Sequence, residues 1–147
     1  MISLQTLETF KEVYKQNKFE ELWFFIEKCY KMVFTLEDLP FLFEKICSTE
    51  LEKQHWGAIG LRIILESENN MPIQQAFDSN IVQCLIEFLD KDDFPCLQLE
   101  SVGILMNFAT WKKKNIQNII DKGGVFSLLR ILDSKHPRIV NLVTILL

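Results

Sequence analysis

The chain has 147 residues, a length typical of one domain, of which 48% are hydrophobic and 24% are charged. This balance predicts a packed, soluble protein and excludes an intrinsically disordered one. The net charge of −4 argues against nucleic acid as the main partner, because proteins that neutralise phosphates usually carry a positive excess.

The first 35 residues predict two amphipathic helices that form an N-terminal cap. One apolar stripe runs through Leu7, Phe10 and Val13, and a second runs through residues 19–34, with a break at Asn17 and Lys18. This segment does not share the spacing of the rest of the chain, and solenoids need a cap at each end. A docking element for a partner is the alternative. No secretory signal or membrane span is expected, because the most apolar run, IVNLVTILL, is far shorter than the roughly 20 residues of a span.

Apolar residues recur at a step of 43 residues through the remainder of the chain. Leu42, Leu85 and Leu128 are related by this step. The same step relates three further sets on that helix face: Leu39, Val82 and Val125; Phe43, Ile86 and Leu129; and Ile46, Leu89 and Leu132. A period of about 40–47 residues with two or three helices per unit predicts an armadillo or HEAT solenoid over residues 36–147.

Each unit is expected to contain a short helix, a glycine turn, a second helix and a longer third helix. In the last unit the first two helices are Ile116–Asp121 and Val125–Leu132, separated by the turn Lys122–Gly124. Glycine tolerates positive φ at a helix C-terminus, and Pro137 suits the first turn of the third helix. Three helices per unit favour the armadillo pattern. The predicted fold is therefore an all-α armadillo-repeat superhelical solenoid of about two and a half repeats.

The segment Pro95–Thr110 predicts one amphipathic helix, although Gly103 in its middle costs roughly 1 kcal/mol relative to alanine. With the residues before it, DFPCLQLESVGILMNFAT resembles the D-F-P-x-L-Q-F-E-A-A-W-A-L-T-N-I-A-S stretch of the importin alpha family. Asp38–Glu66 resembles the family's first repeat, and Ile119–Val140 resembles a repeat junction. The resemblance covers about residues 36–147, and it implies the armadillo fold and a peptide-binding adaptor.

The resemblance also implies a concave groove lined by the third helices. In the family, tryptophan rings form slots for the lysine and arginine side chains of a nuclear localisation signal, and asparagines clamp its backbone. In this chain Gly103 stands at the tryptophan position and Asn107 at the asparagine position. The corresponding residues of the neighbouring repeats are Ile59, Ile63 and Ile145. We therefore expect an apolar groove made of Ile59, Ile63, Gly103, Asn107 and Ile145.

Two further differences separate the chain from this family. Where the family has a small polar segment with an acid, Trp111, Lys112, Lys113 and Lys114 are expected to form a solvated loop whose ammonium groups repel a cationic peptide. Trp111 is expected to anchor packing, with a displaced stacking platform as the alternative. Residues 1–35 also lack the basic cluster with which importin alpha recruits its import receptor.

The last predicted helix is apolar on the face where another repeat would stack. Val143, Leu146 and Leu147 are expected to meet a partner or further residues of the chain, because exposed apolar surface costs about 25 cal/mol per Å². We predict a non-catalytic protein-interaction module, derived from an importin-alpha-like ancestor and serving as a structural subunit of a larger assembly. The alternatives are a nuclear-import adaptor with a degenerate groove and, more remotely, a nucleic-acid binder that uses Lys112–Lys114.

No arrangement of catalytic residues is recognisable, so neither an enzyme nor a small-molecule substrate, cofactor or metal is expected. His55 and His136 lie in different repeats, and the acidic run Asp90, Asp92 and Asp93 is expected to be a solvated loop. The cysteine spacing fits no metal site. The four cysteines are expected to be buried thiols in a reducing intracellular compartment, and the resemblance implies the cytoplasm or nucleus: Cys29, Cys47, Cys84 and Cys96.

Overall fold

The computed structural model describes residues 34–67 and 79–146. These two stretches are helical, and no strand occurs in them. The predicted cap over residues 1–35 lies outside the described residues, except for Phe34 and Thr35. No helix within the described stretches has the length and apolarity needed to cross a membrane. The helices are η1 (Leu36–Asp38), α3 (Leu39–Ile46), α4 (Leu51–Ser67), α6 (Ser79–Phe88), α7 (Pro95–Trp111), α8 (Lys113–Asp121), α9 (Gly124–Ile131) and α10 (Pro137–Leu146).

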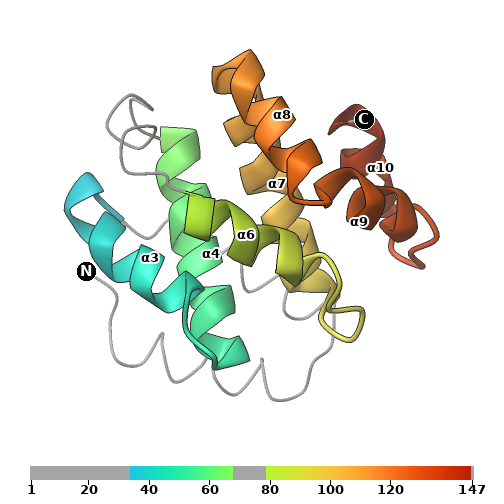
Figure 1. Ribbon diagram of the computed structural model, residues 1–147. Coiled ribbons are helices and arrows are strands. Elements are labelled where there is room, and N and C mark those ends of the chain that lie inside the picture. Colours follow the sequence, from blue (N-terminus) through green and yellow to red (C-terminus); the bar gives the residue numbers. More distant parts are fainter. Residues whose placement is uncertain (1–33, 68–78, 147) are drawn as a thin grey trace.

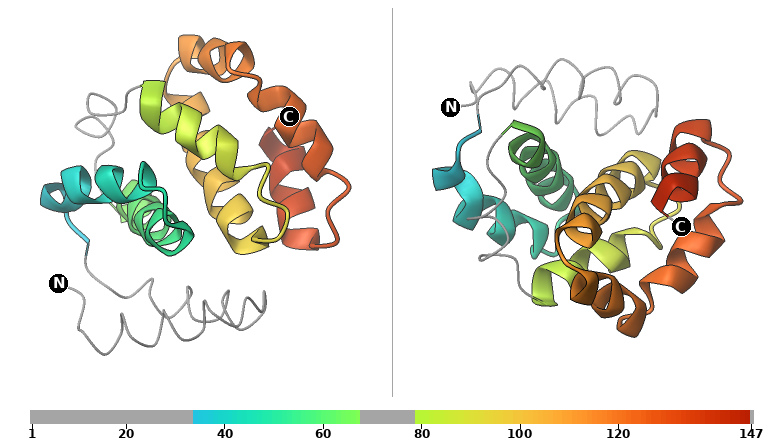
Figure 2. Two further views of the ribbon diagram at one scale, coloured as in Figure 1. Left: turned by 60° about the horizontal axis from the view of Figure 1, so that its bottom comes forward. Right: turned by 90° about the horizontal axis from the view of Figure 1, so that it is seen from above.

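The helices follow one another as stacked units (Figure 1). The first unit contains α3 and α4, the second α6 and α7, and the third α8, α9 and α10. The two views of Figure 2 agree that α4, α7 and α10 line one side, while α3, α6 and α9 lie on the other. Along the first side α4 packs on α7 and α7 on α10, and on the second side α3 contacts α6. This succession confirms the predicted armadillo-type solenoid.

The 43-residue step seen in the sequence is the repeat of the hydrophobic core. Leu42, Leu85 and Leu128 are all buried, one in each unit. They lie on α3, α6 and α9, and all three belong to the hydrophobic core. The recurring leucine therefore marks the position that every unit buries internally.

A close helix contact holds the first unit together. A Cβ atom at Gly57 of α4 would lie 2.8 Å from the carbonyl oxygen of Leu42 and 2.9 Å from the backbone nitrogen of Ile46. Backbone atoms cannot yield as a flexible side chain can, so this crossing of α3 and α4 requires glycine. The sequence analysis did not identify this role of Gly57.

The turns of the third unit agree with the prediction, except at its start. Gly123 has φ +80° between α8 and α9, and α10 begins at Pro137. The expected loop of Trp111–Lys114 is wrong, because only Lys112 is extended between the helices α7 and α8. Trp111 ends α7, half-buried against the ring of Phe108.

The reason for this tight junction is a side-chain cap between the two helices. The Asn115 amide of α8 donates a hydrogen bond of 2.9 Å to the carbonyl oxygen of Phe108, near the end of α7. Helix ends leave such carbonyl groups without partners inside the helix, so the contact favours starting α8 at once. Lys113 and Lys114 consequently lie in the first turn of α8, exposed to solvent.

Candidate partner-binding groove

A cavity of about 230 Å³ opens on the side formed by α4, α7 and α10. Two charged residues come from α4, one leucine comes from α10, and α7 contributes the remaining apolar, polar and acidic residues. Its lining residues are Arg62, Glu66, Leu99, Glu100, Gly103, Met106, Asn107 and Leu142. The cavity therefore bridges all three units and is the natural place to look for the predicted groove.

Gly103 leaves space in this cavity that packing does not demand. A Cβ atom built there would lie 3.8 Å from Cδ of Arg62 and 3.9 Å from Cδ2 of Leu142, which is ordinary van der Waals contact. Unlike Gly57, Gly103 is therefore not required by a close helix approach. Its effect is to leave room between α4, α7 and α10.

Asn107 lies one turn after Gly103 and also lines the cavity. Its amide nitrogen donates a hydrogen bond of 3.0 Å to the Gly103 carbonyl oxygen within the same helix. The side chain is half-buried and is held along α7 by this bond. The structure thus brings Gly103 and Asn107 together at one cavity.

A largely buried ion-pair network lines the cavity beside Gly103. The Arg62 guanidinium donates through Nε to Glu100 of α7 and through Nη1 to Glu66, one turn away on α4, at 3.1 Å. Glu100 is fully buried, and Glu66 is partly exposed. The network joins the first unit to the second, and its two carboxylates share one guanidinium.

Burial and pairing act in opposite directions on the charges of this network. Burial raises the pKa of Glu100, and the nearby Arg62 guanidinium counteracts that shift only in part. For Arg62, burial favours a lower pKa, but the carboxylates of Glu100 and Glu66 outweigh it and hold the pKa above its usual value. Arg62 therefore stays charged. Its guanidinium occupies the place beside Glu100 and Glu66 where a cation of a ligand would otherwise bind.

His55 lies behind the network on α4, two turns before Arg62. It is fully buried, and burial together with the positive charge of Arg62 lowers its pKa from 6.5 to about 3. The imidazole is consequently neutral at pH 7. No group of three or more His, Cys, Asp or Glu residues in the described ranges is arranged to hold a metal ion.

Several residues expected at the groove lie elsewhere. Ile59 and Ile63 are buried in the core, and the neighbouring positions Arg62 and Glu66 line the cavity instead. The reason is the rotation of α4 about its axis, which directs the isoleucines inward. Lys112–Lys114 are exposed and do not line the cavity.

The residues expected at the C-terminal end are also divided. Val143 is fully buried and does not face outward, so its expected role as a partner-facing residue is wrong for this structure. Ile145 on the same helix is 72% exposed and does not line the cavity. The side chain of Leu146 and the whole of Leu147 lie outside the described residues.

The sequence analysis did not predict the Arg62 network. The spacing of Arg62 and Glu66 is a signal for a helical ion pair that could have been used. Glu100 gave no comparable signal, because it lies off the predicted apolar stripe of Pro95–Thr110, where a charged residue is usual. The pairing of Glu100 with Arg62 required the packing of α4 on α7, which local spacing does not contain.

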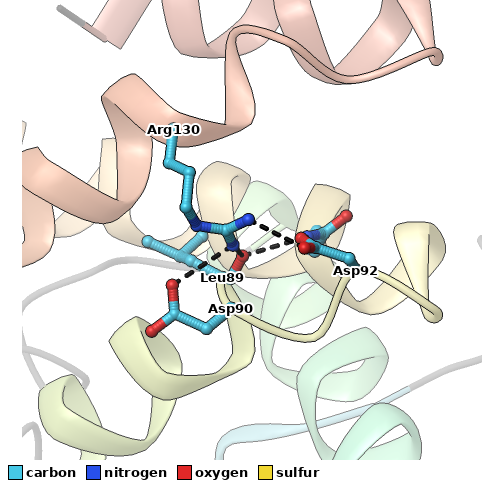
Figure 3. Close-up of polar contacts among 5 residues, drawn as sticks. Leu89, Asp90, Asp92 and Arg130 are labelled. Atoms are coloured by element: carbon cyan, nitrogen blue, oxygen red, sulfur yellow. Dashed lines mark hydrogen bonds and ion pairs between the residues drawn. The ribbon is translucent and has the colours of Figure 1, made fainter.

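A second cavity, of about 440 Å³, lies between the α6–α7 turn and the α9–α10 loop. Arg130 of α9 enters it and donates to Asp92 at 2.8 Å, to Asp90 at 3.3 Å and to the Leu89 carbonyl oxygen at 3.1 Å (Figure 3). The hydrogen bond from Arg130 lowers the pKa of Asp92. Asp90 and Asp92 lie in a solvent-exposed turn, as predicted, and their ion pairs with Arg130 additionally link the second unit to the third.

Large apolar side chains are exposed mainly on the third unit. Six are exposed among the described residues, and only Phe41 lies outside that unit. Two pairs lie at helical spacing, so each pair shares one helix face: Ile116 with Ile120 on α8, and Phe126 with Leu129 on α9. We call these four residues the third-unit apolar surface.

Comparison with known proteins places this geometry in a family. No protein-family model matches the chain. It is 34% identical over 98 residues to importin subunit alpha-3 of Arabidopsis thaliana, which covers 67% of this chain and 18% of that protein. It is 31% identical over 104 residues to importin subunit alpha-6 of Arabidopsis thaliana, an alignment that covers 71% of this chain and 19% of that protein. The chain is a distant homologue of the importin alpha subunits.

The homology extends across plant species and is matched by structural similarity. Importin subunit alpha-1a of Oryza sativa subsp. japonica is 31% identical over 99 residues, covering 67% of this chain and 19% of that protein. The chain thus spans about a fifth of the length of these relatives. A crystal structure of an engineered protein aligns with a TM-score of 0.62 and 27% identity, covering 74% of this chain and 43% of that one. Fold and ancestry therefore agree with the resemblance seen in the sequence.

Proposed function

We propose that the chain is a non-catalytic protein-interaction module that serves as a structural subunit of a larger assembly. The observation that carries this proposal is the third-unit apolar surface, on which Phe126 is 75% exposed. Large apolar residues exposed together on one helix face commonly mark a protein contact. Distant homology to importin alpha subunits supports a protein-binding role. The partner is therefore proposed to cover the third unit at α8 and α9.

The cavity at Gly103 is proposed as a second contact surface on the concave side. Met106 and Leu142 give it an apolar lining, Gly103 gives it room, and Asn107 gives it a polar edge. Arg62 already pairs with both carboxylates there, Glu66 and Glu100. We propose that this surface receives an uncharged side chain of the partner rather than a lysine or arginine.

Co-purification with a matched pair of variants tests the assembly. A tagged full chain expressed in its native cells is isolated together with the proteins that bind it in fixed stoichiometry. Phe126→Ser combined with Leu129→Ser is expected to lose those proteins, because the change removes the third-unit apolar surface. Phe41→Ser, at the exposed phenylalanine of the first unit, is the control and is expected to retain them. Equal retention by both variants, or a stable monomer without stoichiometric partners, would contradict the proposal.

A nuclear-import adaptor that binds basic peptides is the second candidate function. One observation favours it: among the described residues, the buried Oε1 atom of Glu100 accepts no hydrogen bond, and it belongs to the wall of the cavity. A peptide lysine or arginine would satisfy that oxygen. Such an adaptor would work between cytoplasm and nucleus.

Calorimetric titration with a lysine- and arginine-rich peptide separates the two functions. Binding at micromolar concentration or tighter that weakens with salt and with Asn107→Ala would favour the adaptor. No binding at low salt would favour the structural subunit. Thr110→Ala is a control at the same helix, because Thr110 is exposed and does not line the cavity.

A further inference from the structure

Two cysteines from neighbouring units meet at the junction of α3 and α6. Cys47 is the C-cap residue of α3, and Cys84 lies in α6, 37 residues later. Their sulfur atoms are 3.5 Å apart, with the Cys84 thiol donating to the Cys47 sulfur. Both are thiols in this structure. The expectation that the cysteines are all buried is wrong for this pair, since Cys47 is exposed and Cys84 half-buried.

The surroundings of Cys47 hold its sulfur toward α6. The Asn80 amide, one turn before Cys84 on the same helix, donates to the Cys47 sulfur at 3.3 Å. Two donors from α6 thus converge on one sulfur atom of the preceding unit. By contrast, Cys96 on α7 is buried and takes no part in this group.

The separation of the two sulfurs is short enough for bond formation without moving a helix. A disulfide bond is about 2.05 Å long, so the sulfurs must approach by roughly 1.5 Å. Rotation of either side chain about its Cα–Cβ bond can move the sulfur by that much. The helices that carry the two residues are already in contact.

We propose that Cys47 and Cys84 are a redox modification site, which forms a reversible disulfide between the first and second units. The exposed Cys47, as its thiolate, attacks one sulfur of a small disulfide such as oxidised glutathione and expels one glutathione thiolate. The Cys84 thiolate then attacks the Cys47 sulfur of this mixed disulfide and expels the second glutathione. The two cysteine protons pass to the two glutathione thiolates, and two electrons pass from the cysteine pair to glutathione.

The position of this bond gives it a consequence for the solenoid. α3 and α6 lie on the side away from the cavity, while α4 and α7 carry Arg62 and Glu100 on the cavity side (Figure 2). A covalent bond between α3 and α6 would restrict how far the first unit can rotate against the second. Oxidation is therefore expected to stabilise this junction and to limit opening of the cavity at Gly103.

Equilibration of the unmodified full chain in glutathione buffers of graded ratio tests the proposal. Free thiols are alkylated, and peptides are mapped without reduction. We expect one cross-linked species that joins Cys47 to Cys84, formed independently of protein concentration and reversed by dithiothreitol. The oxidised chain should melt roughly 5–15 °C higher than the reduced chain.

Three variants assign the order of the steps. Cys84→Ala should stop at a mixed disulfide with one glutathione on Cys47, and Cys47→Ala should form neither product at this site. Cys96→Ala is the control and should retain the cross-link. Absence of the Cys47–Cys84 peptide at the most oxidising ratio, pairing of either residue with Cys29 or with a second chain, or an unchanged melting temperature would overturn the proposal. If a variant fails to fold, the presence or absence of the Cys47–Cys84 peptide from the unmodified chain still decides whether the disulfide forms.

Discussion

Equivalent positions of the second and third units differ sharply in exposure. Ile86 on α6 is 3% exposed, whereas Leu129, 43 residues later on α9, is 53% exposed. Leu85 and Leu128, one position earlier in each helix, are both buried. The position of Leu85 and Leu128 is therefore buried within each unit. The next position, that of Ile86 and Leu129, is buried only where another unit stacks on it.

The two junctions between units differ in the same way. At the first junction Arg62 binds the fully buried Glu100, whereas at the second Arg130 binds Asp90 and Asp92 near the surface. A buried ion pair is costly to break because the remaining charge has neither water nor a partner. An exposed pair is screened by water and salt and contributes little. Similar residue types therefore carry different energetic weight at the two junctions.

The largest expected effect comes from breaking the buried junction. Arg62→Ala should lower the free energy of unfolding by about 3–5 kcal/mol, because it leaves Glu100 buried without its cation. Arg130→Ala, the matched change at the exposed junction, should lower it by about 1 kcal/mol or less. Urea unfolding followed by circular dichroism measures both. Equal losses would show that burial does not distinguish the two junctions.

Truncation of the equivalent apolar residues tests the stacking argument directly. Ile86→Ala should cost about 2–5 kcal/mol, because it removes fully buried methyl groups and leaves a cavity. Leu129→Ala should change stability by about 0.5 kcal/mol or less in the isolated chain, as for other exposed positions. The same urea titration measures both. A loss at Leu129 as large as at Ile86 would mean that the third unit is covered in solution.

Acidification is expected to lower the free energy of unfolding through His55. The unfolded state binds a proton near the ordinary pKa of 6.5, whereas the folded state resists protonation down to about 3. Stability from this group is therefore complete above pH 6.5 and falls as the pH drops through that window. Between pH 7 and pH 5 the loss is about 2 kcal/mol.

His55→Gln isolates this contribution from that of other groups. The free energy of unfolding is measured by urea titration of both proteins across the pH range. The original chain should lose stability between pH 7 and pH 5 by about the amount given above, and the variant should lack this contribution. The raised pKa of Glu100 acts in the opposite direction, but it is present in both proteins and cancels in the difference. Parallel profiles would rule out His55 as the titrating group.

The last comparison concerns two glycines, Gly103 at an open position and Gly57 at a close helix contact. Gly103→Ala should stabilise the chain by up to about 1 kcal/mol, because alanine favours the helix and its Cβ meets only ordinary contacts. Gly57→Ala is the opposing control and should destabilise, since its Cβ would press on the backbone of α3. Thermal unfolding measures both. A destabilising Gly103→Ala would show that the cavity must stay open for stability itself.

Much of the fold could be predicted from the sequence because it depends on local and periodic features. The recurrence of Leu42, Leu85 and Leu128, the turn at Gly123 and the start of α10 at Pro137 were all predicted correctly. Less of the candidate site could be predicted. Gly103 and Asn107 line one cavity, and their role in binding stays a prediction. Ile59 and Ile63 lie in the core, and the ion-pair network and the Cys47–Cys84 contact were not anticipated.

The amino-acid sequence by itself determined the helices, their order and the repeat that stacks them, because apolar periodicity and turn residues act within one unit. Only the tertiary structure decided which face of α4 lines the cavity, that Arg62 meets Glu100, and that Cys47 meets Cys84. Those contacts join residues of different units, about 40 positions apart, and they depend on the rotation of each helix against its neighbour. A small rotation of a helix about its own axis moves one residue from the core to the surface and its neighbour into the core, while the periodic pattern stays the same. The pattern alone therefore could not assign these contacts.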